Sequence, residues 1–302
     1  MPAKVQKPKD FRSGYVAILG RPNVGKSTLL NRLLRFRLCG VSPRPQTTRH
    51  KLLGVLTGQD YQAVFLDTPG FLRRAQKPLD RRMVHQAREA MQEADLVVLM
   101  VEPRMPGDIE QRLIKELGER QQPTILAINK VDLVKKPWVL PVMEAYSGLY
   151  PFLELVPISA LHQGGVDLLL ELVVQHLPPG EPLFPADTLT DRPERFLTGE
   201  LVREQVFQLY GQEVPYSVAV DVEEFVEGSA EHGGKDYISA TIYVEKPGQK
   251  AILIGSGGTA LKQVGVRARR GIEALLGRPV HLELWVKVHP GWPRDEAFLQ
   301  EV

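Results

Sequence analysis

Hydrophobic positions in the first 176 residues alternate between short continuous runs and longer amphipathic stretches. The short runs are rich in β-branched residues and predict strands, whereas apolar residues spaced three and four apart predict helices. The predicted strands cover residues 15–19, 51–56, 61–66, 95–101, 123–128 and 153–157, and the predicted helices cover 26–34, 80–93, 107–120, 137–150 and 166–176. This alternation indicates a doubly wound α/β sheet, in which ligands bind at the carboxyl ends of the strands.

The pattern changes after a proline-rich stretch at residues 177–185. Beyond it we predict, in chain order, a helix at 192–210, strands at 215–226 and 237–245, helices at 249–254 and 259–276 joined by a glycine turn, and a strand at 280–286. This order indicates a small α+β domain. The expected domains are an N-terminal extension (1–13), a first domain (14–178), a linker with few contacts (179–191) and a second domain with a C-terminal tail (192–302).

Composition narrows the class of protein without identifying it. Hydrophobic residues make up 43% of the chain and charged residues 25%, as in ordinary globular proteins. The longest apolar run, residues 96–101, is far too short for a membrane span, and residues 1–10 lack the apolar run of a secretory signal. We therefore expect a cytoplasmic protein. The single cysteine, Cys39, excludes an intrachain disulfide and is expected to be a small, partly buried hydrophobe.

Charge is distributed unevenly, although the net charge is only +2. Residues 1–180 contain 25 basic and 17 acidic side chains, and the rest contains 13 and 19. Within that second part, residues 246–278 contain seven basic side chains and one acid, whereas residues 181–245 contain four and fourteen. This local excess indicates a polyanion site, although such a run is also typical of a solvated helix face.

A phosphate-binding motif follows the first predicted strand. Residues 20–27 read GRPNVGKS and open the first helix, which is the context this motif requires. Glycines let backbone N–H groups converge on phosphate oxygens. Lys26 is expected to reach the β and γ phosphates and Ser27 to bind magnesium. The predicted phosphate-binding residues are Gly20, Pro22, Asn23, Val24, Gly25, Lys26, Ser27 and Thr28.

Three further clusters lie at strand ends in the order that a guanine-nucleotide switch needs. Residues 67–70 read DTPG, which offers a carboxylate for magnesium at Asp67 and a γ-phosphate-sensing glycine at Gly70. Residues 129–132 read NKVD, and the carboxylate of Asp132 matches two adjacent N–H donors of guanine. Each cluster alone is typical of a polar turn, but their joint order predicts a guanine site. The predicted base-binding residues are Asn129, Lys130, Asp132, Ser159 and Ala160, the last two offering backbone N–H groups to the guanine oxygen.

These motifs resemble the translation-factor-like GTPases. Residues 45–49, Pro-Gln-Thr-Thr-Arg, resemble the first switch of that group, and the resemblance implies a magnesium ligand at Thr48, with Thr47 as the alternative. The implied magnesium ligands are Ser27, Thr48 and Asp67, and the implied catalytic residues are Asn23, Lys26, Thr48 and Gly70.

The residue after DTPG is unusual for a GTPase. Many such enzymes orient the attacking water with a glutamine there, but this chain has Phe71, which cannot hydrogen-bond water. The sequence is similar to a subclass with a hydrophobic residue at this position, in which an asparagine matching Asn23 is associated with potassium. We hypothesise slow hydrolysis that potassium or a bound partner accelerates. A purely structural role for Asn23 in the loop turn is the alternative.

The basic stretch of the second domain contains a helix, a GxxG turn and a second helix. KH domains clamp about four nucleotides with this arrangement, because a turn without side chains lets phosphates approach backbone N–H groups. A plain loop between packed helices is the alternative, but the charge excess and the α-β-β-α-α-β order favour a type II KH domain that binds RNA. The predicted RNA-binding residues are Lys250, Gly255, Ser256, Gly257, Gly258, Lys262, Arg267, Arg269 and Arg270.

A GTPase domain followed by this KH domain resembles the Era-like family of bacterial ribosome-assembly GTPases. The similarity runs from about residue 13 to residue 295 and includes residues 198–200, 245–246 and 291–292. It implies GTP or GDP and Mg²⁺ as ligands, GTP-dependent binding to the 3′ end of 16S ribosomal RNA, a role in maturation of the 30S subunit, a monomer, and loose attachment to the inner face of the membrane. Gly257 departs from the family, whose members often have a basic residue there; Lys262 is the expected compensation.

Several other residues are given ordinary roles. His85, His162, His176, His281 and His289 lie in unrelated elements without metal-ligand spacing. Trp285 is expected to be packed, and the role of Trp292 stays open. Two alternative functions are an RNA-binding module whose nucleotide site is structural, and an ATP-dependent kinase, which the NKVD motif disfavours.

Overall fold

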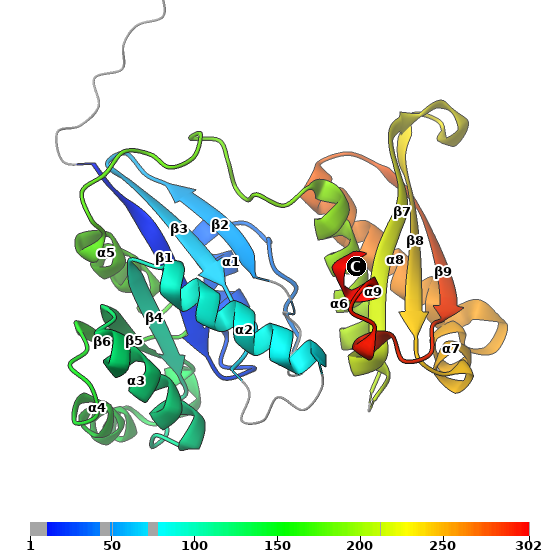
Figure 1. Cartoon of the computed structure of the whole chain (residues 1–302). Coiled ribbons are helices and arrows are strands. Elements are labelled where there is room, and N and C mark those ends of the chain that lie inside the picture. Colours follow the sequence, from blue (N-terminus) through cyan, green and yellow to red (C-terminus); the bar gives the residue numbers. More distant parts are fainter. Residues whose placement is uncertain (1–10, 43–48, 50, 72–77, 212, 302) are drawn as a thin grey trace, which may run out of the picture. The chain divides into compact units, whose positions relative to one another are not determined.

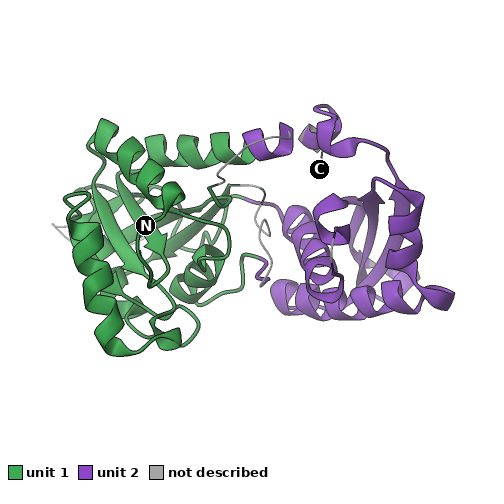
Figure 2. Ribbon diagram, turned by 90° about the horizontal axis from the view of Figure 1, so that it is seen from below, with its two compact units in different colours: residues 1–39, 48–75, 82–191 green, residues 40–47, 76–81, 192–302 purple. Residues whose placement is uncertain are grey.

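The computed structural model describes residues 11–42, 49, 51–71, 78–211 and 213–301, and these form two compact units (Figures 1 and 2). Among the described residues, the first unit contains 11–39, 49, 51–71 and 82–191. The second contains 40–42, 78–81 and the described part of 192–302.

The first unit is built on a six-stranded sheet of order β2-β3-β1-β4-β5-β6. β2 pairs antiparallel with β3, and every other pair is parallel. The predicted doubly wound sheet is therefore confirmed, with a hairpin at one edge. The strands are β1 (Arg12–Gly20), β2 (Leu52–Thr57), β3 (Tyr61–Asp67), β4 (Leu96–Val101), β5 (Thr124–Ile128) and β6 (Glu154–Pro157).

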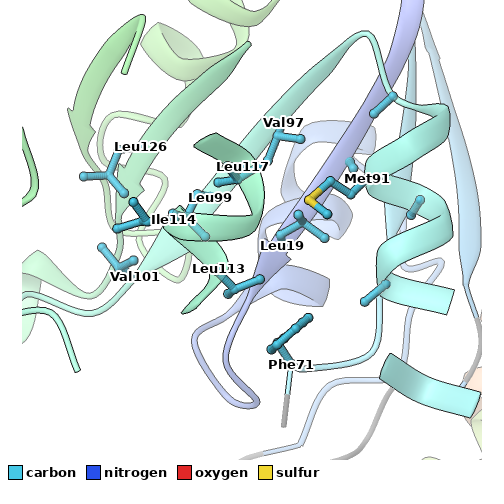
Figure 3. Close-up of a cluster of buried hydrophobic side chains, with 14 of the residues drawn as sticks. Leu19, Phe71, Met91, Val97, Leu99, Val101, Leu113, Ile114, Leu117 and Leu126 are labelled. Atoms are coloured by element: carbon cyan, nitrogen blue, oxygen red, sulfur yellow. The ribbon is translucent and has the colours of Figure 1, made fainter. Parts of the chain in front are cut away.

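Helices cover both faces of this sheet, which is why its central strands are continuously apolar. The helices are α1 (Lys26–Leu34), α2 (Pro78–Glu93), α3 (Asp108–Arg120), α4 (Val139–Ser147) and α5 (Val166–His176), with short 3-10 turns η1 (Val131–Leu133) and η2 (Lys136–Trp138). On one face, buried side chains of β1, β4 and β5 pack against α2, α3 and α4 (Figure 3). α1 and α5 contact each other in the same unit. The carboxyl ends of β1, β3, β5 and β6 lead into the loops that hold the predicted motifs.

The segment at residues 179–191 is anchored to the first unit by a buried side chain of the sheet. Gln62 on β3 is fully buried, and its amide oxygen accepts hydrogen bonds from the backbone of Leu183 at 2.6 Å and Phe184 at 2.9 Å. Its amide nitrogen donates to the carbonyl of Phe184 at 2.9 Å. A buried amide needs polar partners, and this segment supplies them.

The second unit contains a three-stranded sheet of order β7-β8-β9, with β7 antiparallel and β9 parallel to β8. The helices α6, α7 and α8 pack on one face, where the buried side chains of α8 recur every four residues, as in Val264, Ala268 and Ile272. The elements are α6 (Glu194–Leu209), η3 (Val214–Ser217), β7 (Val218–Ser229), η4 (Ala230–His232), β8 (Lys235–Val244), α7 (Pro247–Ile254), η5 (Ser256–Gly258), α8 (Thr259–Leu276), β9 (Val280–Val288), η6 (Trp292–Arg294) and α9 (Phe298–Glu301).

The two C-terminal tryptophans have different surroundings, and one of them contradicts the sequence interpretation. Trp285 on β9 is 57% exposed, so the expectation that it is packed is wrong. Trp292 is 1% exposed, donates from its indole nitrogen to the carbonyl of Ser217 at 3.1 Å, and packs against Phe298. The C-terminal tail therefore covers part of the sheet face opposite the helices, whereas Trp285 lies on its uncovered part. None of the helices in the described ranges combines the length and apolar character needed to cross a bilayer.

Candidate nucleotide-binding and RNA-binding sites

The phosphate-binding loop is shaped by glycines that have no room for a side chain. Gly20 has φ +149°, and a Cβ there would lie 2.4 Å from the carbonyl oxygen of Met100. Gly25 has φ +106°, and its Cβ would lie 2.3 Å from the amide nitrogen of Asn129. Asn23 adopts φ +63°, a left-handed conformation that asparagine tolerates better than most residues. The loop therefore curls tightly against the neighbouring strand ends.

Lys26 lies inside this curl. Its ammonium donates to the carbonyls of Gly20 at 3.2 Å and Arg21 at 2.9 Å, and the side chain is buried. Burial lowers the pKa of Lys26 to about 8, with the nearby carboxylate of Asp67 acting in the opposite direction. The lysine is thus held at the loop centre, where its charge is poorly compensated by the protein and would be stabilised by phosphate.

Ser27 and Asp67 meet although they are 40 residues apart in the sequence. The Ser27 hydroxyl donates to the Asp67 carboxylate at 2.8 Å, and Asp67 is buried. A hydroxyl and a carboxylate beside a phosphate loop form the oxygen donor set that Mg²⁺ prefers. These two residues therefore fit a magnesium ion. The third implied ligand, Thr48, and its alternative, Thr47, lie outside the described residues.

The DTPG segment is fastened to the phosphate loop. The N–H of Phe71 donates to the carbonyl of Gly20 at 3.0 Å, and a Cβ on Gly70 would lie 2.5 Å from the backbone nitrogen of Pro22. The Phe71 ring is buried in the same hydrophobic cluster as Leu19 and Met91 (Figure 3). Phe71 therefore contributes to packing, and its side chain offers no hydrogen bond to a water molecule at the nucleotide.

Asn129 connects the phosphate loop to the loop after β6. Its amide donates to the carbonyl of Val24 at 2.7 Å, and its oxygen accepts from the N–H of Ala160 at 2.9 Å. The N–H of Ser159 donates to the carbonyl of Gly164 at 2.8 Å. Both N–H groups expected to face guanine are thus engaged within the protein in this structure, and their contact with the guanine oxygen stays a prediction for the bound state.

Asp132 lies beside the same loop. Its carboxylate accepts a hydrogen bond from the Ser159 hydroxyl at 2.6 Å, and the side chain is partly exposed. Residues from the turns after β5 and β6 therefore converge on one place, as the motif order predicted. A carboxylate that is partly exposed and fixed on one side can still present acceptor lone pairs to the edge of a purine.

Sequence reasoning missed three side chains that hold these loops. Glu102, after β4, pairs with Lys130 at 2.7 Å. Arg32 on α1 donates to the carbonyls of Ala160 at 3.2 Å and Leu161 at 2.6 Å. The buried Glu110 on α3 pairs with Arg21 of the phosphate-binding loop at 3.4 Å. No local motif marks these residues, because their partners are distant in the chain or are backbone atoms.

The predicted GxxG turn forms between α7 and α8. Gly255, Gly257 and Gly258 have φ of +71°, +58° and +79°. A Cβ on Gly257 or Gly258 would meet no atom within 4 Å, and the hydroxyl of Thr259 donates to the carbonyl of Ser256 at 2.9 Å. The turn is thus a fixed backbone loop with open space on its outer side, which suits the approach of a phosphate backbone.

The predicted basic residues of α8 are spread over its exposed half rather than aligned along one flank. Lys262, Arg267, Arg269 and Arg270 are exposed, and Lys250 on α7 is half-buried. A helix turns by about 100° per residue, so Arg269 lies near the flank of Lys262 whereas Arg267 is rotated by about 140°. Arg269 also lies 3.9 Å from Glu273. Among the residues on α8, Lys262 is the basic one nearest in sequence to the turn.

The structure brings His281 together with two side chains that the sequence pattern does not place beside it, His232 and Glu283. Strand register, which the sequence pattern does not give, is responsible for this meeting.

The sites and the fold define a P-loop GTPase that carries a KH domain. Residues 15–130 match the family model described as 50S ribosome-binding GTPase, and residues 213–293 match the KH domain model. The GTPase Era of Geobacter metallireducens is 49% identical over 293 residues, which cover 97% of each chain. This chain belongs to the Era family of GTPases.

Solved structures of the family agree with the fold. A crystal structure of Era in complex with MgGDPNP and nucleotides 1506–1542 of 16S ribosomal RNA has a TM-score of 0.92 and 40% identity, with 96% of this chain and 98% of that chain covered. Aquifex aeolicus Era bound to GDP.AlF4⁻ gives the same values. Family membership sets aside the alternatives of an ATP-dependent kinase and of a structural nucleotide site without turnover.

Proposed function

We propose that this GTPase uses its nucleotide state to control binding of the KH domain to the 3′ region of 16S ribosomal RNA, and that it assists maturation of the 30S subunit. One observation carries the proposal. The same chain contains a guanine-nucleotide site whose loops are joined by hydrogen bonds and a GxxG turn with open space on its outer side. The Era structure that holds MgGDPNP and nucleotides 1506–1542 of 16S ribosomal RNA supports it, because it resembles this chain over nearly its whole length.

The geometry of the nucleotide site supports a separate role for each group of its residues. Gly20, Gly25 and Lys26 hold the phosphates, because they form a tight loop around a buried ammonium. Asp132 reads guanine, with Asn129 fastening the two loops that flank it. The remaining predicted loop residues, Pro22, Asn23, Val24 and Thr28, complete the phosphate cradle.

Magnesium is proposed to bind at Ser27 and Asp67, whose oxygens lie 2.8 Å apart, together with Thr48 of the first switch. When bound, the ion neutralises charge that develops on the phosphates. Gly70, which contacts Pro22 of the loop directly, is the residue proposed to respond to the γ phosphate.

Potassium is proposed as an accelerator of hydrolysis. The buried Phe71 leaves no side chain at that position to orient water, and Asn23 sits in the loop with a left-handed backbone. A monovalent cation near Asn23 would add positive charge beside the phosphates. We expect turnover in potassium to exceed turnover in sodium, and Asn23→Ala to abolish the difference. Equal rates in both salts would remove potassium from the proposal without touching the guanine site.

Binding of RNA by the KH domain is tested separately. Binding of an RNA fragment spanning nucleotides 1506–1542 should be measured with a GTP analogue, with GDP and without nucleotide, against a scrambled RNA of equal length. We expect the tightest binding to the native sequence with the GTP analogue. Equal affinity in all three states would overturn the coupling, and equal affinity for both RNAs would overturn the ribosomal target. We further propose a cytoplasmic location, a monomeric state and peripheral membrane contact, as the resemblance to the Era-like family implies.

A further inference from the structure

The uncovered face of the KH sheet contains a group of metal-ligating side chains that the GTPase function does not use. His232 comes from η4, in the connection between β7 and β8, while His281 and Glu283 come from β9. Their candidate ligand atoms all lie within 4.8 Å of one another, and none of the three side chains is deeply buried. Among the described residues, this is the one group of at least three such side chains close enough to hold an ion.

Strand geometry explains how the group forms. His281 and Glu283 are two residues apart on β9 and therefore share a face of the sheet. The Nε2 atom of His281 lies 3.5 Å from Oε1 of Glu283. Two ligands of a tetrahedral zinc ion, at bonds of about 2.05 Å, are separated by about 3.3 Å. These two atoms already have nearly that separation.

A tight turn and an aromatic ring place the third ligand. Gly233 and Gly234 follow His232 with φ of +67° and +77°, so the chain reverses directly after it. The His232 ring stacks on Tyr237 at 4.3 Å between centroids and lies 4.4 Å from the His281 ring. A candidate ligand nitrogen of His232 therefore lies within 4.8 Å of the ligand atoms of His281 and Glu283.

Tyr237 also orients the carboxylate. Its hydroxyl donates to Oε2 of Glu283 at 3.1 Å, which leaves Oε1 toward His281. Hydrogen bonds of this kind to a ligating carboxylate are a recurring feature of metal sites and fix the direction of the donor atom. The group therefore has three ligands and a partner that holds one of them.

We propose that His232, His281 and Glu283 form a zinc-binding site. Two imidazoles and one carboxylate are a donor set that suits Zn²⁺ and leaves a fourth position for water, whereas Mg²⁺ and Ca²⁺ prefer oxygen alone. Zinc bound there joins the β7–β8 connection to β9 and stabilises this end of the sheet. The site lies on the KH unit and requires neither nucleotide nor RNA.

Calorimetric titration of the full chain with ZnCl₂ tests the proposal. The protein carries no histidine tag and is saturated with GDP and excess Mg²⁺, so that the magnesium ligands are occupied. We expect one equivalent of zinc in the wild type, lost in His281→Ala and Glu283→Gln and kept in His176→Ala, which removes an exposed histidine outside the group. Tyr237→Phe, which removes only the orienting hydroxyl, should weaken binding about tenfold.

Thermal unfolding provides a second measurement, because a ligand that binds only the folded state raises Tm. Zinc should raise the Tm of the wild type and of His176→Ala but not of His281→Ala, with a cooperative unfolding transition in the absence of zinc in all three to show that each variant is folded. No zinc uptake by the wild type, or equal uptake and affinity in wild type and His281→Ala, would overturn the site.

Discussion

Glycines have different structural roles at the nucleotide site and at the GxxG turn. In the nucleotide site, a Cβ on Gly20, Gly25 or Gly70 would collide with the protein itself at 2.4, 2.3 and 2.5 Å. In the GxxG turn, a Cβ on Gly257 or Gly258 would meet nothing within 4 Å. The first set is required for the chain to close around its own loops, whereas the second set keeps space open for something outside it.

This contrast predicts how each site responds to substitution. Side chains added to the nucleotide loops disturb the loop itself, so nucleotide binding and local stability are lost together. A side chain added at Gly257 or Gly258 meets no neighbouring atom, so apart from the strain of a positive φ it acts on the approaching ligand. The two sites therefore need different kinds of substitution. At the nucleotide site the clearest test exchanges a side chain for one of nearly the same volume, and at the turn it adds a side chain to a glycine.

The largest effect is expected at Asp132. Asp132→Asn replaces one of two carboxylate acceptors by an amide donor that faces the N–H groups of guanine, and a lost complement of this kind costs a factor on the order of 10⁴. The remaining oxygen can still accept from the Ser159 hydroxyl, so the loop stays in place. Titration with fluorescent GDP measures the loss, and Asp167→Asn, an exposed acid on α5, is the control. Undiminished GDP affinity in Asp132→Asn would remove this residue from the guanine site.

Lys26 is expected to give the next largest effect, on stability. The pKa of Lys26 is about 8 in the folded protein against 10.5 when unperturbed, so between these values the unfolded chain holds a proton that the folded chain has released. Stability therefore rises as pH increases from about 8 to 10.5. Below pH 8 the buried charge costs on the order of 3 kcal/mol.

Replacing Lys26 by an uncharged residue should show how much the buried charge lowers the free energy of unfolding. In nucleotide-free protein, Lys26→Met should raise Tm at pH 7 and flatten the gain between pH 8 and 10.5, while Lys115→Met, at an exposed position of α3, should do neither. Thermal unfolding followed across this pH range is the measurement. Identical pH profiles for Lys26→Met and wild type would show that burial of the ammonium is not costly.

Gly258→Asp is expected to reduce RNA affinity on the order of 100-fold with little change in GDP binding. The new carboxylate occupies the open side of the turn and repels phosphate, and each charge-assisted hydrogen bond lost is worth about 1.5–3 kcal/mol. Gly277→Asp is a matched control, because Gly277 also has positive φ and open surroundings but ends α8 at its other end. Equal RNA losses in the two variants would indicate a strain effect rather than a phosphate contact.

The same contrast shows what sequence reasoning could reach. Motifs whose chemistry is local, such as residues 20–27 and the GxxG turn, were placed in the correct elements because strand and helix patterns surround them. The meeting of Ser27 with Asp67 followed from the rule that the carboxyl ends of parallel strands share one edge of a sheet. Local patterns and chain order are sufficient for such features.

Features that depend on register were missed. The pairing of Glu102 with Lys130 and the anchoring of the 179–191 segment by Gln62 require knowing which side chains face each other across a sheet or turn. Exposure of Trp285 was also missed, because alternation in a strand does not tell which of its faces the helices cover. The zinc ligands proposed above belong to the same class, since His232 and His281 are 49 positions apart.

The smallest effect is expected among the basic residues of α8. It shows best which side of this helix contacts RNA. Lys262 lies four residues beyond Gly258, whereas Arg267 is rotated about 140° from it around the helix. If phosphates follow the open side of the turn, Lys262→Ala should weaken RNA binding about tenfold and reduce its salt dependence by about one phosphate contact. Arg267→Ala should weaken RNA binding less than about threefold, because only a distant, screened charge is removed. Affinities measured for both variants at several salt concentrations separate the two cases. Equal losses would mean that RNA contacts more than one flank of α8, and that all four basic residues of the helix belong to the binding surface.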